Sequence, residues 1–105
     1  MKLETYQNQA RKYSVLENDA DRIAYGLLNM AGEVGEITSK HAKAIRDKTP
    51  VDKADLEKEL GDLLWSICAY ADGMGFSLED VAKINLAKLR SRQRRNVIAG
   101  SGDDR

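Results

Sequence analysis

The sequence has few residues that interrupt or cross-link a chain. Its 105 residues include one cysteine, one proline and one histidine. A single cysteine excludes an intrachain disulfide or a cysteine-based zinc site, and Cys68 lies in an apolar run where a buried, reduced thiol is expected. No apolar run reaches the roughly 18 residues of a membrane span. We therefore expect a soluble, cytoplasmic protein with no membrane partner.

Net charge is also absent, because 17 basic side chains balance 17 acidic ones. A neutral chain has no global field that would attract nucleic acid, so nucleic acid is not the expected partner. The distribution is nevertheless uneven. A basic patch near the C-terminus contains Lys88, Arg90, Arg92, Arg94 and Arg95.

Helix breakers are so sparse that the sequence predicts an all-α fold. Pro50 is the only proline, and the glycines cluster near residues 73–75 and 100–102. Apolar residues recur at three- and four-residue spacings in the segments between these breakers, as in amphipathic helices. The expected helices cover residues 3–17, 20–46, 50–72 and 77–94, within a single domain of residues 1–105. Residues 99–105 lack periodicity and are expected to form a flexible tail unless a partner or ligand orders them.

Residues typical of helix ends set these boundaries. Asn18 or Asp19 can cap the second helix, and Ser77 can cap the fourth. Thr49 is expected to cap the third helix, with Pro50 at its first position. Short links favour a four-helix, bundle-like protomer. Because so short a chain buries a limited core, assembly into a helical dimer or tetramer is expected.

Two pairs of carboxylates are spaced three residues apart. Glu33 and Glu36 lie in the second expected helix, and Glu59 and Asp62 lie in the third. Relative to a core position of its own helix, the first acid of each pair falls at about 300° and the second at about 240°. Either pair alone is more often a solvated helix face. The matched offsets, however, bring all four acids to one edge if the two apolar stripes pack together.

Four converging anions repel one another unless cations neutralise them. Mg²⁺ prefers oxygen ligands and is commonly shared between carboxylates and substrate phosphates. Gly35 and Gly61 lie between the acids of each pair and leave space for a ligand, although each costs about 1 kcal/mol of helix propensity. These residues predict a Mg²⁺ site, with Mn²⁺ as an alternative ion.

The same residues resemble the signature of a known family. Glu33-x-x-Glu36, a 22-residue spacer and Glu59-Leu-Gly-Asp62-Leu-Leu-Trp are similar to the MazG-type nucleotide pyrophosphohydrolases of the all-α NTP pyrophosphatase superfamily. The resemblance covers roughly residues 22–105 and includes Gly75-Phe-Ser-Leu-Glu-Asp-Val-Ala, Asn85-Leu-Ala-Lys88-Leu-Arg-x-Arg92 and Gly100-Ser-Gly-Asp-Asp-Arg105. One departure is Gly32, where the family often has a first glutamate. This departure bears more on substrate preference than on activity.

The resemblance implies an enzyme that hydrolyses nucleoside or deoxynucleoside triphosphates to monophosphate and pyrophosphate. Glu33, Glu36, Glu59 and Asp62 would bind the metal and act in catalysis. A metal can lower the pKa of bound water, and an acid that is not fully engaged as a ligand can act as general base. The resemblance also implies a homo-oligomer, either a dimer or a tetramer.

Four other residues are candidates for substrate contacts. Asn85, Lys88 and Arg92 fall within or beside the apolar face of the fourth helix, where polar groups need partners. Lys88 and Arg92 suit phosphates, and Asn85 suits base or sugar, whereas the alternative is snorkelling side chains and an interhelical hydrogen bond. Lys40 lies four residues after Glu36, which favours a salt bridge and a phosphate contact equally.

Other functions fit the sequence less well. A di-iron bundle needs two Glu-x-x-His pairs, and this chain has one histidine without a glutamate at that spacing. A helical interaction or nucleic-acid-binding module could use the patch from Lys88 to Arg95, but it would leave the carboxylates without a purpose. Phosphoribosyl-ATP pyrophosphohydrolase belongs to the same superfamily, and its last helix and tail match less well.

Overall fold

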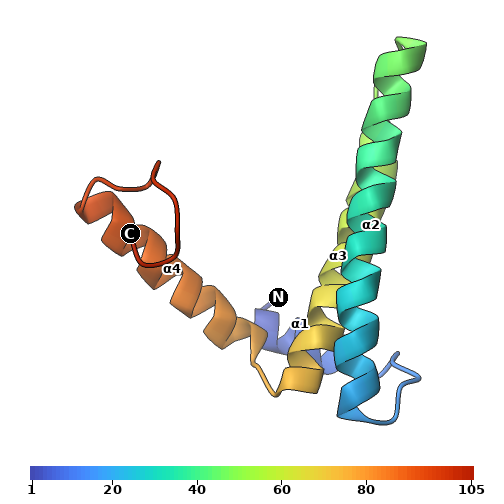
Figure 1. Ribbon diagram of the computed structural model, residues 1–105. Helices are drawn as coiled ribbons and strands as arrows, with labels where there is room; N and C mark the ends of the chain where they lie inside the picture. Colours follow the sequence, from blue (N-terminus) through green and yellow to red (C-terminus); the bar gives the residue numbers. More distant parts are fainter.

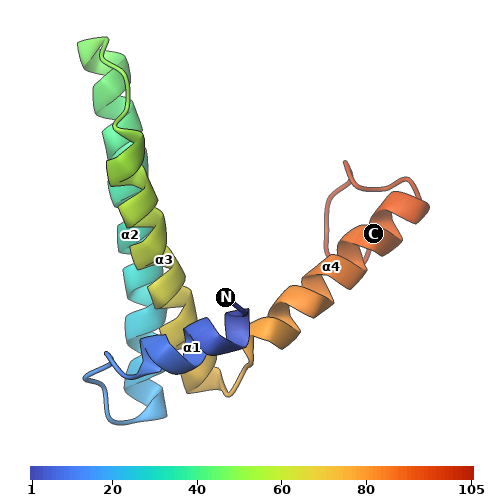
Figure 2. The ribbon, with the colours of Figure 1, turned by 180° about the vertical axis from the view of Figure 1, so that it is seen from behind.

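A computed structural model describes all 105 residues of the chain. It contains four helices and no strand. The helices are α1 (Leu3–Arg11), α2 (Asp19–Asp47), α3 (Lys53–Met74) and α4 (Leu78–Arg94). In Figure 1, α2 and α3 run antiparallel as a long hairpin, and α4 projects away from the base of this hairpin. Figure 2 shows α1 lying across the same base. The predicted all-α fold is confirmed, and no helix is both long and apolar enough to cross a membrane.

Several predicted helix ends are confirmed. The Asn18 side chain accepts a hydrogen bond of 2.8 Å from the Asp21 amide at the start of α2. Ser77 caps α4 in the same way, with its hydroxyl 3.3 Å from the Asp80 nitrogen. Gly75 ends α3 in the left-handed region, with φ of 74°, a conformation that glycine adopts without a steric penalty.

The predicted start of α3 is wrong. Thr49 closes α2 instead of opening α3, because its amide donates to the Ala44 carbonyl at 3.0 Å after Lys48 has turned left-handed at φ of 54°. This pattern is that of a Schellman motif. Asp52 is the actual cap, and its side chain accepts from the Asp55 amide at 3.2 Å. Pro50 therefore lies in the connection and not at the first helical position.

The first helix is shorter than predicted, since α1 ends at Arg11 and not at residue 17. The Ser14 hydroxyl accepts a hydrogen bond of 3.3 Å from the Leu16 amide. Such local side-chain bonds compete with the helical backbone pattern. The segment between α1 and α2 is consequently an irregular connection and not a continuation of the helix.

A small core at the base of the hairpin fixes the first and last helices. Its buried apolar residues are Ala10, Cys68, Ala71 and Leu78. Burial raises the pKa of the Cys68 thiol to about 11, so this expected core thiol is neutral at physiological pH.

Gln7 is the polar centre of this core. Its amide nitrogen donates to Asp72 Oδ1 and to the Phe76 carbonyl, both at 2.9 Å. Its amide oxygen accepts from the Leu78 nitrogen at 2.8 Å. One buried side chain thus joins α1 to the end of α3 and the start of α4.

Beyond this core the chain is open. Its accessible surface is 7802 Å², against about 5,900 Å² for a compact monomer of this mass. Its radius of gyration is 16.6 Å, against about 13 Å for a compact domain of this length. Apolar side chains exposed by at least a third lie on the hairpin and on α4, including Leu27, Leu28, Val34, Ile45, Leu60, Val81, Ile84, Leu86 and Leu89.

Candidate functional site

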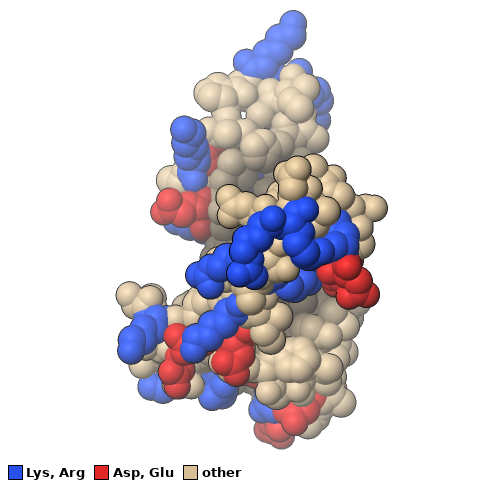
Figure 3. Space-filling model, turned by 90° about the vertical axis from the view of Figure 1, so that its left-hand side faces the viewer, with Lys and Arg blue, Asp and Glu red and all other residues tan.

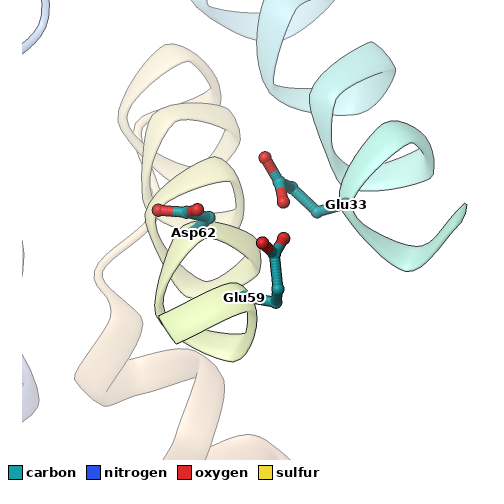
Figure 4. Close-up of side chains that lie close together, drawn as sticks. All are labelled: Glu33, Glu59 and Asp62. Atoms are coloured by element: carbon teal, nitrogen blue, oxygen red, sulfur yellow. The ribbon is translucent and has the colours of Figure 1, made fainter. Parts of the chain in front are cut away.

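The hairpin brings three of the four predicted acids together. Glu33 from α2 and Glu59 and Asp62 from α3 each offer a carboxylate oxygen, and these oxygens lie within 4.8 Å of one another (Figure 4). Oxygen ligands on opposite sides of a divalent cation lie about 4.2 to 5 Å apart, given metal–oxygen distances of about 2.1 to 2.5 Å. We call these three residues the acidic cluster.

Two oxygens of the acidic cluster lack partners. Oε2 of Glu33 and Oε2 of Glu59 are buried without any hydrogen bond. Burying a carboxylate oxygen in this way is unfavourable unless a donor or a metal compensates for the lost water. The donor set therefore fits a hard divalent cation, and these two oxygens are available as its ligands.

The electrostatics of the acids agree with crowding of negative charge. Partial removal from water, followed by the nearby Glu59 carboxyl, raises the pKa of Glu33. The Glu59 carboxyl is also the main cause that raises the pKa of Glu36. Glu36 is exposed and lies outside the acidic cluster, so it is a neighbour of the cluster and not one of its three converging groups.

Lys40 is engaged by acids of the facing helix. Its ammonium group pairs with Asp55 and with Oε1 of Glu59, the latter at 3.0 Å. Hydrogen bonding to these carboxylates raises the pKa of Lys40, and Lys40 in turn lowers the pKa of Glu59. The ion pair with Glu36, one of the two alternatives that the sequence left open for Lys40, is not formed. Asp55 was missed by sequence reasoning, although its position four residues before Glu59 places both acids on one face.

The glycines between the acids face open space. A Cβ added at Gly35 or at Gly61 would meet no atom within 4 Å. The surface beside the acidic cluster is therefore uncrowded, as the sequence suggested. Gly26, lower in the hairpin, differs, because an added Cβ there would lie 2.7 Å from the Tyr70 backbone nitrogen.

An apolar cavity of about 80 Å³ lies beside Trp65, one helical turn after Asp62. Its walls include Val15, Leu16 and Tyr25, and the Tyr25 and Trp65 rings meet edge to face with centroids 6.4 Å apart. Trp65 is thus packed against a neighbour and also borders a cavity.

The predicted contacts on α4 lie away from the acidic cluster. Asn85 is exposed. Lys88 pairs with Asp103 Oδ1 at 2.8 Å, and Arg92 contacts the same oxygen at 3.3 Å. No hydrogen bond or ion pair joins α4 to the acids of the hairpin. The structure therefore does not bring the two groups of predicted residues together within one chain. The ion pairs of Lys88 and Arg92 with Asp103 were not predicted from the sequence.

The all-α fold and the facing carboxylates of the hairpin agree with the family that the sequence resembles. The family model described as the MazG nucleotide pyrophosphohydrolase domain matches residues 24–97, and the chain belongs to this family. The chain is also similar to the gene 37 protein of Mycobacterium phage L5, with 38% identity over an alignment of 114 positions that covers all of both chains. No solved structure matches. Family membership supports nucleotide pyrophosphohydrolase activity in general.

Proposed function

We propose that this chain hydrolyses nucleoside or deoxynucleoside triphosphates to nucleoside monophosphate and pyrophosphate, with Mg²⁺ as its cofactor and Mn²⁺ as an alternative. The observation that carries this proposal is the pair of buried, unpartnered oxygens in the acidic cluster of a MazG-family hairpin. We place the activity in the cytoplasm, which supplies both the nucleotide and the ion.

In this proposal all four acids hold the metal, and one of them also acts as general base. Glu33, Glu59 and Asp62 hold the metal, together with Glu36. These carboxylates would hold Mg²⁺ beside the substrate, where the ion would supply neutralisation of the phosphate oxygens and polarisation of the phosphoryl group. Glu36 is exposed and lies at the edge of the cluster, outside its three converging groups, so it is the acid least enclosed by the others and the one we assign to accept the proton of the attacking water.

Two other features of the hairpin support the substrate site. The Lys40 ammonium group pairs with Oε1 of Glu59 at 3.0 Å. This ion pair orients the carboxylate and leaves its Oε2 without a partner. The small apolar cavity is lined in part by Trp65, which follows Asp62 by one helical turn, and an apolar wall of this kind suits the face of a nucleobase.

We further propose that the protein acts as a homo-oligomer, a dimer or a tetramer. The 7802 Å² of accessible surface exceeds the compact-monomer value by about 1,900 Å². Exposed apolar side chains lie on the hairpin and on α4, which project apart in Figures 1 and 2. Packing between copies would cover these faces, and it would let Asn85, Lys88 and Arg92 of one copy contact the nucleotide held by another.

The experiment is release of pyrophosphate from a panel of ribo- and deoxynucleoside triphosphates, with and without Mg²⁺. Glu59→Gln keeps the side-chain shape and removes one ligand charge. Glu57→Gln is the matched control, because Glu57 is exposed on the same helix and has no ion pair. We expect Mg²⁺-dependent turnover that falls by about 100-fold or more in Glu59→Gln, since loss even of outer partners costs metal sites about 10- to 100-fold. Glu57→Gln should retain it.

Absence of turnover on every nucleotide, with the helical fold intact, would refute the proposal. The acids would then be a solvated helix face. Salt-dependent binding of DNA or RNA under the same conditions would assign the basic patch to nucleic acid instead. Equal loss in Glu57→Gln and Glu59→Gln would show that a general charge effect, and not a metal ligand, had been removed.

A further inference from the structure

One polar contact crosses the interface between α2 and α3 directly beside the acidic cluster. The Asn29 side-chain amide on α2 donates to the Ser66 hydroxyl on α3 at 2.6 Å. Ser66 is completely buried, and its hydroxyl in turn donates to the Asp62 carbonyl at 3.0 Å. These hydrogen bonds connect α2 to the backbone of an acid that belongs to the cluster.

This contact lies on the face of the hairpin where the acids converge. Asn29 precedes Glu33 by four residues and Ser66 follows Asp62 by four residues, so each lies one helical turn from an acid of the cluster. Because α2 and α3 are antiparallel (Figure 1), both steps lead toward the base of the hairpin. Lys40 makes the interhelical hydrogen bonds on the other side of the cluster. The acidic cluster is therefore enclosed between two polar contacts.

Charge within the chain does little to hold the acidic cluster together. Glu33 and Asp62 form no ion pair, and Lys40 reaches only Glu59 among the three acids. Figure 3 shows Lys and Arg side chains gathered on the face that includes α4, and no side chain of this helix pairs with the cluster. Neighbouring carboxylates repel one another. The distance between Glu33 and Asp62 therefore depends on adjacent contacts between the two helices.

A hydrogen bond fixes the register of two helices more closely than apolar packing does. Apolar burial is not directional, whereas a hydrogen bond weakens steeply when its geometry is distorted. A slip of one residue moves a helix by about 1.5 Å and turns it by about 100°, and Mg²⁺ demands oxygens at about 2.0–2.1 Å in octahedral geometry. Fixing register is also the best-attested use of polar contacts buried between helices.

We propose that Asn29 and Ser66 are positioning residues, which fix the register of α2 against α3 so that Glu33 and Asp62 meet at the distance that a divalent ion requires. Neither residue touches the ion. The inference rests on the metal site of the proposed function and adds to it a contact outside the four acids. Loss of the contact should weaken metal binding while the helices stay formed.

The test is binding of Mn²⁺ alone to the full chain, measured from the electron paramagnetic resonance signal of the free ion. Asn29→Ala and Ser66→Ala should each weaken binding by about tenfold or more, since partners that orient metal ligands are worth about 10- to 100-fold in affinity. Thr38→Ala is the matched control, because the Thr38 hydroxyl also donates to a backbone carbonyl, that of Gly35, but reaches no other helix. It should bind Mn²⁺ like the wild type.

Two further variants separate positioning from a general loss of stability. Either single substitution already breaks the hydrogen bond between the helices, so Asn29→Ala combined with Ser66→Ala should bind Mn²⁺ about as weakly as the weaker single variant. Ser77→Ala removes the cap of α4, which lowers stability away from the hairpin, and should leave Mn²⁺ binding unchanged. Circular dichroism checks the helices. If the buried Ser66→Ala variant unfolds, the partly exposed Asn29 decides.

Unchanged Mn²⁺ affinity in Asn29→Ala would overturn the positioning role, as would equal weakening in Thr38→Ala or Ser77→Ala. If binding weakens in Glu59→Gln but not in Asn29→Ala, the metal site stands and only this inference fails. A wild type that binds no Mn²⁺, or a Glu59→Gln variant that binds it as tightly, would overturn both. The expected pattern of Mn²⁺ binding without nucleotide turnover would support the positioning role and refute the proposed hydrolysis.

Discussion

The hairpin and α4 differ in both charge and packing. Helices α2 and α3 are held so closely that an added Cβ at Gly26 would touch the Tyr70 backbone, and the hairpin carries acids with unpartnered oxygens. Helix α4 contacts α1 at its base, exposes apolar side chains along its length and carries the basic patch. The groups suited to metal and those suited to phosphate therefore lie in separate regions of one chain.

This difference shows what each region requires to function. A metal site needs ligands fixed by rigid elements, and the paired helices provide this rigidity. A helix without a partner on its apolar face has no such constraint within the chain. Substitutions that change one region at a time test whether the hairpin and α4 differ in this way.

The largest effect is expected on assembly. Ile84 is 63% exposed on α4, so in a lone chain its replacement by serine would be close to neutral. If copies pack through α4, Ile84→Ser should shift the molar mass in light scattering toward that of a single chain, whereas the adjacent Lys83→Ser should not. A wild type that already has the mass of one chain would contradict the oligomer.

The next effect is expected on stability of the hairpin. Gly26→Ala places a methyl group 2.7 Å from the Tyr70 nitrogen, and such overpacking typically costs about 1–3 kcal/mol. Gly35→Ala meets no atom within 4 Å and should stabilise the helix by about 0.5–1 kcal/mol. Urea unfolding measures the change in the free energy of unfolding, which should fall in Gly26→Ala and rise in Gly35→Ala. Equal behaviour of the two alanines would mean that α2 and α3 are not in close contact at Gly26.

The smallest effect is expected at the start of α3. Asp52→Ala removes the cap that accepts from the Asp55 amide at 3.2 Å and should cost about 1 kcal/mol. Thr49→Ala should change the free energy of unfolding by less than about 0.5 kcal/mol, because the Thr49 side chain caps nothing. Thermal unfolding distinguishes the two. A larger loss at Thr49 than at Asp52 would restore the helix start that the sequence suggested.

Local features of the fold were predictable, and features that depend on competition between neighbours were not. Asn18 and Ser77 cap helices as expected, because an N-cap acts on an amide only two or three residues ahead. Thr49 also has the chemistry of a cap. It closes α2 instead, since the left-handed turn at Lys48 uses its amide first.

The candidate site divides in the same way. The three-residue spacing within each pair predicted that the acids of α2 and α3 share an edge, and Glu33, Glu59 and Asp62 do converge. The roles of all four acids stay predictions. Lys40 was equally consistent with a partner on its own helix, and only the packing of the two helices shows that it pairs across to Asp55 and Glu59.

Four features follow from the sequence alone: the helical class, most helix ends, the two carboxylate pairs and the family. These depend on residues within about four positions of one another, where helical geometry fixes which side chains share a face. Three other features are seen only in the folded chain: the direction of α4, the two buried oxygens without partners, and the contact of Asp103 with Lys88 and Arg92. Such contacts join residues distant along the chain, and their geometry depends on how whole helices pack and turn, which no local spacing specifies.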